Sequence, residues 1–388
     1  MDFVGGKIKG YVGPQDVAEQ LDDVEQVIVD FVEQATSTVD VAVQELDSIP
    51  IAEALIRQKR AGCSVRIVLN HSYLQDEVSR SRPLDPALTT VAALAADDSG
   101  DYKVNRDVFA ALCRCGVEVR IDLNPTAIWH QKFIVNDLRI EGDGDFATGR
   151  RPGLLTGSAN FTGTDCHNNL NHVLVFDTRG RRLVEKEFAS EFAEAWGGEF
   201  SRGRLGKPPR TIGVDGVPVK VLFAPDHGPE AEVVKQLLKC PKGGYIDCAM
   251  FTFAGSSAID DAMITLADAE RSIRVVLDRG QAAPSKTWPA ARWLREGGIE
   301  VLVPRRGGPL RKLHHKLLVV NRSTVVAGSF NYSEPATLFN DEAMLVIGSP
   351  HDVVEGITVD HAACSQIADF FGKEIDRIAS AAEEWGPP

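Results

Sequence analysis

The chain has 388 residues, of which 44% are hydrophobic and 25% are charged, a composition typical of soluble globular proteins with one large or two ordinary domains. Its formal net charge of −13 argues against a protein that coats nucleic acid or anionic membranes through bulk charge, but leaves room for a small basic site. The sequence has no apolar run of about 18 residues, so we expect no transmembrane helix.

The N-terminal segment and the cysteines indicate a cytoplasmic protein. The segment MDFVGGKIKGYVGPQD contains no apolar stretch of the kind found in secretory signals. The seven cysteines are scattered, and their odd number fits a reducing compartment better than a disulfide framework. Cys113 and Cys115 form a lone C-x-C with no second Cys or His pair at zinc spacing, so we expect no metal site and no other cofactor.

The predicted elements of the first half begin with a helix. Apolar residues at Val17, Leu21, Val24, Ile28 and Phe31 recur with a helical period. The elements expected after it are a strand at 39–46, a helix at 51–61, a strand at 64–70, a helix ending at Gly116, a strand, a strand that carries His130, a strand ending in GSxN and a helix near 182–196.

The second half repeats this order. SVRIVLN at 64–70 matches SIRVVLD at 272–278, and GSANFT at 157–162 matches GSFNYS at 328–333. Strands that alternate with helices twice over predict an α/β fold: two α/β/α halves related by a pseudo-twofold axis, each with a mixed sheet and helices on both faces. The polar, Pro- and Gly-rich segment 199–216 marks the boundary. The predicted halves are residues 1–205 and 206–388.

Two connections are longer in the first half than in the second. One extra stretch lies within 76–106, and the other lies between Asp137 and Gly157. Both are rich in charge and turn-forming residues, so we predict that they form loops or a lid that sets the choice of substrate.

Two residue pairs carry the candidate chemistry, His130 with Lys132 and His314 with Lys316. Residues two apart in a strand point to the same face of the sheet, so each His shares a face with its Lys. Each pair precedes a GSxN segment whose Ser and Asn are also two apart. These residues are Ser158 and Asn160 in the first half and Ser329 and Asn331 in the second.

These groups suit a phosphodiester substrate. Lys, Ser and Asn can donate to the phosphate oxygens, on which negative charge builds in the transition state. One His can attack phosphorus, while a second, protonated His donates to the leaving alkoxide and later activates water. Because each half offers one such His, two halves that meet would complete a single site within a monomer.

The pattern H-x-K-x4-D/N followed by GSxN, present twice, resembles the phospholipase D superfamily over nearly the whole chain. It is most similar to the branch that holds small bacterial endonucleases and mitochondrial cardiolipin hydrolases. The resemblance implies a reaction through a phosphohistidine without a metal, with His130 as the nucleophile and His314 as the acid and base. Lys132, Lys316, Asn160 and Asn331 would hold the phosphate, with Ser158 and Ser329 in support.

Two motif positions depart from the family pattern. Asn321 stands where the motif usually has an Asp, as Asp137 does in the first half, and we interpret this position as structural. In the family an acidic residue after each motif orients a catalytic imidazole. Glu342 can do so in the second half, but Asn171 stands at the matching place in the first. Our hypothesis is that Glu342 supports the nucleophile; the sequence leaves open which half it serves.

Further basic residues have two interpretations. Arg305, Arg306 and Arg311 precede the second motif, either as solvated loop residues or as a basic rim that draws an anionic substrate into an acidic protein. Arg150 and Arg151, in the second long connection, allow the same two interpretations. The remaining histidines near the motifs are predicted to be structural, and they are His167, His172 and His315.

The substrate stays open between several classes. Two full motifs in one chain favour a phospholipase D that hydrolyses a phospholipid phosphodiester, and the acidic charge weighs against a nuclease that follows long nucleic-acid tracks. The absence of a basic amphipathic helix weighs against strong membrane docking. The alternatives are a nuclease that cleaves DNA or RNA by the same mechanism, a phosphatidyltransferase, and a module that binds phosphate without turnover.

Overall fold

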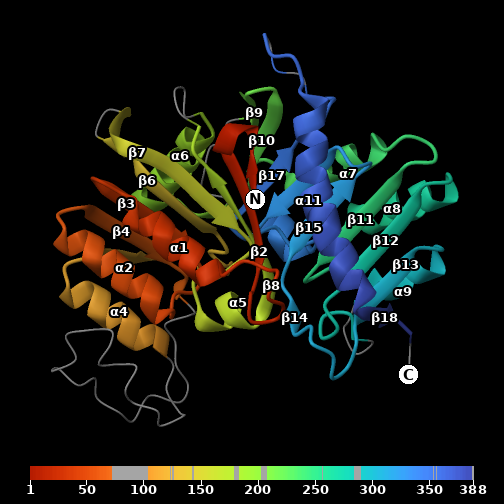
Figure 1. Cartoon of the computed structure of the whole chain (residues 1–388), viewed down its shortest axis with the longest axis horizontal. Helices are drawn as coiled ribbons and strands as arrows, with labels where there is room; N and C mark the ends of the chain where they lie inside the picture. Colours follow the sequence, from red (N-terminus) through yellow and green to blue (C-terminus); the bar gives the residue numbers. More distant parts are fainter. Residues whose placement is uncertain are drawn as a thin grey trace.

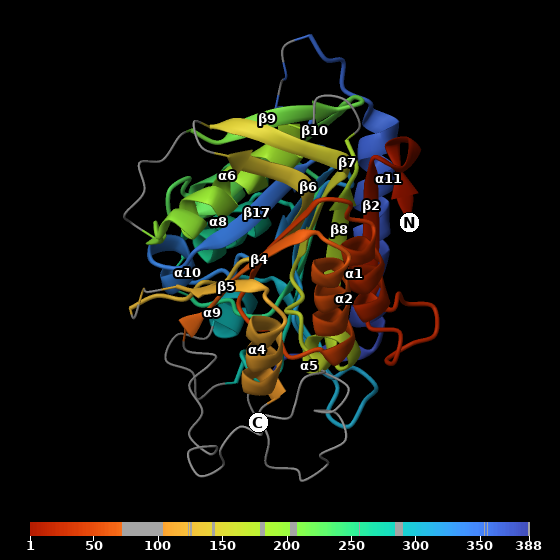
Figure 2. The same cartoon turned by 90° about the vertical axis from the view of Figure 1, so that its left-hand side faces the viewer.

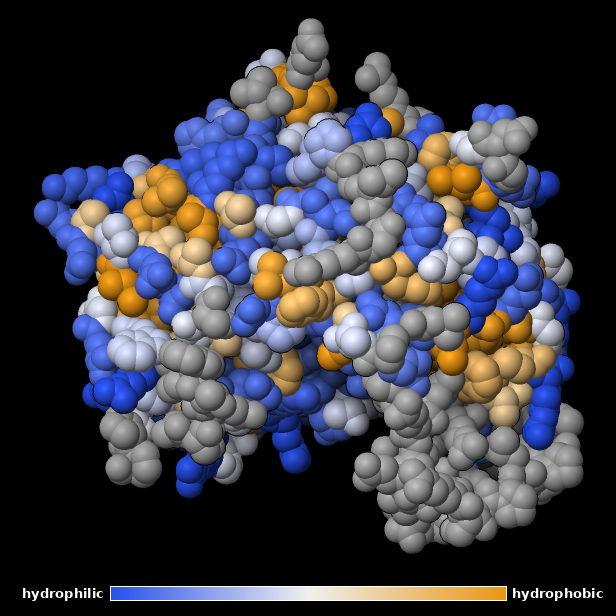
Figure 3. Space-filling view, turned by 180° about the vertical axis from the view of Figure 1, so that it is seen from behind, coloured by the Kyte–Doolittle hydropathy of each residue, from blue (hydrophilic) through white to orange (hydrophobic). Residues whose placement is uncertain are grey.

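Two nine-stranded mixed sheets form the framework of the chain, one in each half. The computed structural model describes residues 1–71, 104–122, 124, 126–141, 144–178, 183–201, 208–255, 257–283, 290–352, 354 and 356–386. Figure 1 shows the two halves side by side, with the longest helix running between them. None of the helices in these ranges is long and apolar enough to cross a membrane. On the face seen in Figure 3, hydrophobic residues occur as separate patches among hydrophilic ones.

The sheet of the first half has three parallel strands at one edge, antiparallel pairs along the rest of its path, and one short strand that pairs in parallel off this path. Its strands in spatial order are β1 (Asp2–Phe3), β2 (Ile8–Gly13), β8 (Asn169–Phe176), β7 (Asp145–Gly157), β6 (Lys132–Glu141), β3 (Thr38–Val43), β4 (Ser64–Leu69) and β5 (Glu118–Ile121). A ninth strand from the second half, β14 (Lys312–Leu313), pairs with β8.

Eight strands of the second sheet have the same order and the same directions. Its strands are β9 (Arg210–Val214), β10 (Val217–Ala224), β17 (Glu342–Ile347), β16 (Thr324–Gly328), β15 (Lys316–Val320), β11 (Tyr245–Met250), β12 (Ser272–Leu277), β13 (Glu300–Pro304) and β18 (Ala382–Glu384). The ninth strand, β18, pairs with the edge strand β13 instead. The predicted duplication of a mixed α/β sheet is therefore confirmed.

Helices cover both faces of each sheet. In the first half α1 (Val24–Glu33), α2 (Ile49–Arg60) and α4 (Val104–Arg114) lie on one side, and α6 (Leu183–Gly197) lies on the other (Figure 2). The second half has α7 (Pro229–Leu238), α8 (Ala258–Asp268) and α9 (Ala290–Glu296) on its outer side and α11 (His361–Ser380) on its inner side. The short elements are η1 (Val4–Gly6), α5 (Gly163–His167) and α10 (Glu334–Leu338).

Strand alternation divides the core into three layers. Val39, Val41 and Val43 of β3 face an outer core with α1 and α2, whereas Ala42 faces a central core. That central core takes side chains from both halves: the ring of Phe188 in α6 packs edge-on against one ring in β6 and one in β10, at centroid distances of 5.1 Å each. The two sheets therefore share one hydrophobic layer. The predicted boundary at residues 205 and 206 falls outside the described residues.

The first helix is shorter than predicted. It begins at Val24, after Asp23, whose side chain accepts a hydrogen bond from the Gln26 N–H at 3.0 Å. Val17 and Leu21 precede the helix, and Leu21 packs into the central core, whereas the helix itself packs into the outer core. In the sequence, the apolar period extends toward the N-terminus beyond the start of the helix. It does so because Val17 and Leu21 pack against the central core, whereas the helix packs against the outer core.

The second long connection is neither a loop nor a lid, contrary to the prediction. It extends β6 and β7 into a long hairpin, paired from Leu138 with Thr148 to Glu141 with Asp145 beyond a β-bulge. Because β6 starts beside His130 and runs away from it, the hairpin tip lies about 30 Å along the strand from the motif. The first long connection lies mostly outside the described residues.

Candidate active site

Each motif histidine is anchored on the opposite half. The backbone N–H of His130 donates to Asp341 O at 3.0 Å, and the N–H of Asp341 donates to Ile128 O at 3.1 Å. In the same way, the N–H of His314 donates to Leu170 O at 2.9 Å, next to the pairing of β14 with β8. The two segments that carry the imidazoles therefore cross over at the junction of the halves.

Both imidazoles line one cavity of about 300 Å³. Gln44 directly follows β3 as Phe251 directly follows β11, so these residues occupy equivalent places in the two walls. The first half adds three carboxylates to its wall, and the second half adds an ammonium group. The lining residues are Gln44, Glu45, Asp47, His130, Asn160, Thr162, Thr164, Asp165, Asn169, Phe251, Lys312 and His314.

His130 pairs with the carboxylate of the second half. Its Nδ1 lies 2.7 Å from Glu342 Oε2, and both side chains are buried. Because the carboxylate accepts a hydrogen bond from the Nδ1–H, this nitrogen carries the ring proton and Nε2 keeps its lone pair. Burial lowers the pKa of His130 to about 4, although the charge of Glu342 opposes this shift. The free imidazole is therefore neutral near pH 7, as a nucleophile requires.

The GSxN serine of the second half holds this carboxylate. Ser329 Oγ donates to Glu342 Oε2 at 2.6 Å and accepts from the Ala343 N–H at 3.0 Å. Gly328 permits this close packing, since a Cβ there would lie 2.3 Å from Ala343 O. The hydroxyl is thus directed at the acidic partner of the histidine.

His314 pairs with an amide of the first half. Its Nδ1 lies 2.9 Å from Asn171 Oδ1, which also accepts from Ser158 Oγ at 2.8 Å. The Asn171 Nδ2 donates to Asp165 O and Asn169 O at 3.0 and 3.3 Å, and these bonds fix the amide with its oxygen toward the imidazole. Burial, reinforced by the ammonium groups of Lys316 and Lys132, holds the pKa of His314 well below its usual value.

The two motif lysines flank the histidines. Lys132 Nζ donates to His130 O at 2.8 Å and to Gln44 Oε1 at 3.2 Å, and Lys316 Nζ donates to His314 O at 2.8 Å. Burial lowers the pKa of Lys132 to about 8 and, together with the charge of Lys132, holds the pKa of Lys316 well below its usual value. A bound anion would favour the charged form of both groups.

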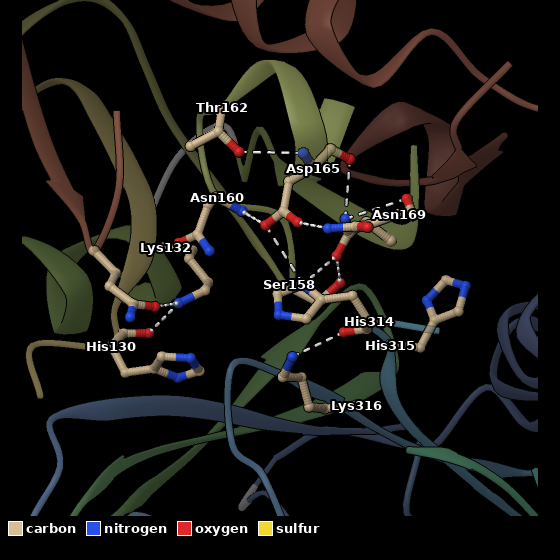
Figure 4. Close-up of polar contacts among 12 residues, drawn as sticks. His130, Lys132, Ser158, Asn160, Thr162, Asp165, Asn169, His314, His315 and Lys316 are labelled. Atoms are coloured by element: carbon tan, nitrogen blue, oxygen red, sulfur yellow. Dashed lines mark hydrogen bonds and ion pairs between the residues drawn. The ribbon is translucent and has the colours of Figure 1, made fainter. Parts of the chain in front are cut away.

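The side-chain oxygens of the two GSxN asparagines differ in their hydrogen bonds. Asn160 lines the cavity, and its Oδ1 has no hydrogen-bond partner in the part of the chain that the structure describes. Asn331 Oδ1 accepts from the Thr252 N–H at 3.3 Å. Figure 4 shows Asn160 beside Lys132, where both side chains could donate to one phosphate.

Asp137 and Asn321 lie outside the cavity. Both have a left-handed backbone, with φ of 53° and 48°, which Asp and Asn adopt more readily than most residues. The Asp137 carboxylate accepts from the N–H groups of Thr36, Ser37 and Arg151, among others, at 2.7 to 3.1 Å. Although burial raises the pKa of this carboxyl, the hydrogen bonds lower it to about 2. The geometry agrees with a structural role.

We expect Asp137→Ala to lower the free energy of unfolding by about 3 kcal/mol, because it leaves several partly buried N–H groups without their acceptor at once. Asn321→Ala is the matched control, with an expected loss of about 1 kcal/mol from the backbone conformation alone. Urea unfolding of both variants measures the difference, and equal losses would contradict the role assigned to the carboxylate.

The predicted arginines do not line the cavity. Arg305, Arg306 and Arg311 are exposed, and Arg305 Nε donates to Ala382 O at 2.9 Å. Arg150 and Arg151 lie in β7 on the long hairpin, next to the Asp137 cluster and away from the site. Among the described residues, Lys312, which directly follows Arg311, does line the cavity.

The other histidines near the motifs have structural contacts, as predicted. His172 Nε2 accepts from the Gly328 N–H at 3.2 Å, so its Nδ1 carries the proton that it shares with His315 Nδ1, 3.2 Å away. His315 Nε2 then donates to Glu374 at 3.1 Å. His167 contacts Asp16 and Glu25 near the surface.

Asp165 is a residue that the sequence analysis missed. Its carboxylate lies in the cavity wall and 3.4 Å from His314 Nδ1. A useful signal was available: the segment after GSAN contains an acidic residue in a half whose expected acidic position holds Asn171.

A family model described as cardiolipin synthase, PLD-like domain, matches residues 28–196 and 234–362. No curated protein matches the chain by sequence. Among solved structures, phosphatidylserine synthase from Haemophilus influenzae Rd KW20 has 14% identity and a TM-score of 0.61, covering 98% of this chain and 87% of that chain. Polyphosphate kinase from Porphyromonas gingivalis has 12% identity and a TM-score of 0.55, covering 95% of this chain and 56% of that chain.

A third solved structure, Nuc, a phospholipase D family member from Salmonella typhimurium, has 17% identity and a TM-score of 0.36 and covers 44% of this chain and 99% of that chain. At identities this low, the likeness to the two longer structures shows a shared fold and says nothing of a shared substrate.

Proposed function

This chain belongs to the family of PLD-like domains described for cardiolipin synthase, and we propose that it is a phosphodiesterase that works through a phosphohistidine and needs no metal ion. The observation that carries the proposal is the pair of buried imidazoles in one cavity, each with Nδ1 engaged by the opposite half. This arrangement leaves one Nε2 as a nucleophile and the other for proton transfer. The site is complete within one chain, so a monomer suffices.

In the first step, His130 Nε2 attacks phosphorus and forms the N–P bond. The P–O bond to the leaving alcohol breaks, and protonated His314 gives its Nε2 proton to the departing oxygen. Glu342 stabilises the positive charge that develops on the attacking imidazole, because its Oε2 accepts a hydrogen bond from His130 Nδ1, 2.7 Å away. Lys132 and Lys316 offset the charge that builds on the phosphate oxygens.

In the second step, a water molecule replaces the alcohol. His314 Nε2 takes a proton from this water, its oxygen bonds to phosphorus, the N–P bond breaks, and His130 returns to its neutral form. The product is a phosphomonoester. An alcohol in place of the water would give transfer instead of hydrolysis, so hydrolase and phosphatidyltransferase share this mechanism.

For the substrate, we favour a phospholipid over a nucleic acid. Glu45 and Asp47 lie in the cavity wall of the first half, and their negative charge opposes a polyanion whose neighbouring phosphates must pass close to them. The leaving alcohol that this wall suits is neutral or cationic. Phe251 gives the other wall an aromatic surface, with Lys312 Nζ 4.5 Å from the centre of its ring. A nuclease remains the alternative.

An assay panel tests the proposal. Wild-type protein in EDTA should release p-nitrophenol from bis(p-nitrophenyl) phosphate, and it should hydrolyse phosphatidylcholine or cardiolipin faster than single-stranded DNA, duplex DNA or RNA. Activity that appears only with added metal would contradict the mechanism. Faster cleavage of a nucleic acid would favour the nuclease, and binding of phosphodiesters without turnover would replace the enzyme with a binding module.

A further inference from the structure

The two catalytic imidazoles have unequal partners. Glu342 in β17 gives His130 a carboxylate, whereas Asn171 at the equivalent place in β8 gives His314 only a neutral amide. A carboxylate favours an imidazolium much more than an amide does. Since His314 must carry a proton in the first chemical step, the first half lacks a carboxylate where the mechanism most needs it.

A carboxylate from another element of the first half reaches the same nitrogen. Asp165 Oδ2 lies 3.4 Å from His314 Nδ1, and both side chains are only 5% exposed. Asp165 comes from α5, the short helix that follows GSxN, and Figure 4 shows it above the His314 ring. The equivalent residue of α10 in the second half is Ala336, the third residue of that helix as Asp165 is of α5. Each half thus supplies one carboxylate to the histidine of the other half, Glu342 from β17 and Asp165 from α5.

Hydrogen bonds fix the Asp165 carboxylate in this place. Its Oδ2 accepts from the Asn160 N–H at 2.7 Å, and its Oδ1 accepts from Asn169 Nδ2. Its own N–H donates to Thr162 Oγ1 at 3.1 Å. A side chain held from several directions keeps its charge near the imidazole throughout the reaction.

We propose that Asp165 is a positioning residue that stabilises the imidazolium form of His314, in place of the carboxylate that Asn171 lacks. The inference rests on the proposed function, because it concerns the proton that His314 gives to the leaving group. At 3.4 Å the carboxylate acts mainly through its charge, while Asn171 accepts the Nδ1 hydrogen bond.

The surroundings of His314 oppose its protonation. Burial contributes most, four cationic or basic groups add to it, and a bound phosphodiester would cancel part of the effect of these charges. Asp165 places negative charge beside the imidazole, and Glu45 lies close enough to Asp165 for the two carboxylates to interact. The groups that oppose protonation of His314 are Lys316, Lys132, Lys312 and His130. The pKa of Glu45 is raised, mainly by burial and then by the charge of Asp165.

Asp165→Asn tests the inference with a series of aryl methyl phosphates whose leaving groups range from p-nitrophenol to phenol. A good leaving group needs little protonation, so the rate with p-nitrophenol should fall less than about threefold, while the rate with phenol should fall at least about 30-fold. The alkaline limb of the kcat profile should move about one pH unit lower, because the imidazolium loses its anionic neighbour.

Asn171→Asp in the Asp165→Asn background is the matched variant. It places a carboxylate where the second half has Glu342, so it should restore much of the rate with phenol and return the alkaline limb toward its original pH. Melting temperatures of all three proteins show whether each is folded.

Equal losses for all leaving groups, with no shift of the pH profile and no rescue, would reduce Asp165 to a structural residue and overturn the inference alone. Wild-type protein that hydrolyses none of these diesters would overturn the proposed function and the inference together.

Discussion

His130→Ala is expected to lower kcat/KM for bis(p-nitrophenyl) phosphate by about four orders of magnitude or more, leaving only what binding and the remaining cations contribute. The variant removes the cavity imidazole whose Nδ1 donates to a buried carboxylate, at 2.7 Å from Glu342, and whose Nε2 is left for attack. Without it no N–P bond can form. Release of p-nitrophenol over a range of substrate concentrations measures the loss.

His167→Ala is the matched control for this variant, because His167 lies outside the cavity and contacts Asp16 and Glu25 near the surface. Its rate should stay within about twofold of wild type. Residual activity of His130→Ala within about tenfold of wild type would assign the nucleophile to another group, and equal losses in both variants would point to a general loss of structure.

His314→Ala is expected to separate the two chemical steps. p-Nitrophenol departs with little need for a proton, so the variant should still form the phosphoenzyme and release a burst of about one equivalent. Hydrolysis of the N–P bond needs a base for the attacking water, and that step should slow by about 10³- to 10⁴-fold. Stopped-flow absorbance records both the burst and the steady rate.

The same experiment on Glu342→Gln tests whether the Glu342 carboxylate supports the attack by His130. The change keeps the shape of the side chain but removes the charge that stabilises His130 as it attacks, so burst formation should slow by about 10²-fold or more. A burst of unchanged rate would show that Glu342 does not serve the nucleophile, and absence of a burst from His314→Ala would show that His314 is needed before the covalent step.

Much of the fold follows from the sequence because the duplication is explicit. The strands around 64–70 and 272–278 repeat residue for residue in type, and the structure places them as β4 and β12 at the same position of two matching sheets. The His-x-Lys spacing likewise fixed which side chains share a face. These features depend on local periodicity and on a repeat, both of which a single sequence displays.

The pairing of the histidines with their partners could not be predicted in this way. Glu342 contacts His130 and Asn171 contacts His314, and both contacts cross between the halves. They depend on how the two sheets meet, and no local pattern reports that geometry. Asp165 escaped notice because it stands in α5, six residues before the position where an acidic residue was expected.

The long hairpin of the first half shows a different limit. Residues 138–156 are rich in Gly and charge, which favours loops, yet backbone pairing extends β6 and β7 and compensates for their weak strand preference. Tertiary pairing thus outweighed local composition, and it moved the inserted residues away from the site that they were expected to cover.

Mass spectrometry of His314→Ala, quenched in denaturant shortly after mixing with bis(p-nitrophenyl) phosphate, tests the central claim most directly. The account predicts an adduct of one p-nitrophenyl phosphoryl group, stable in alkali, labile in acid and located on His130 by peptide mapping. An adduct on another residue, or a burst of p-nitrophenol from the variant that leaves no adduct on the protein, would contradict the phosphohistidine mechanism.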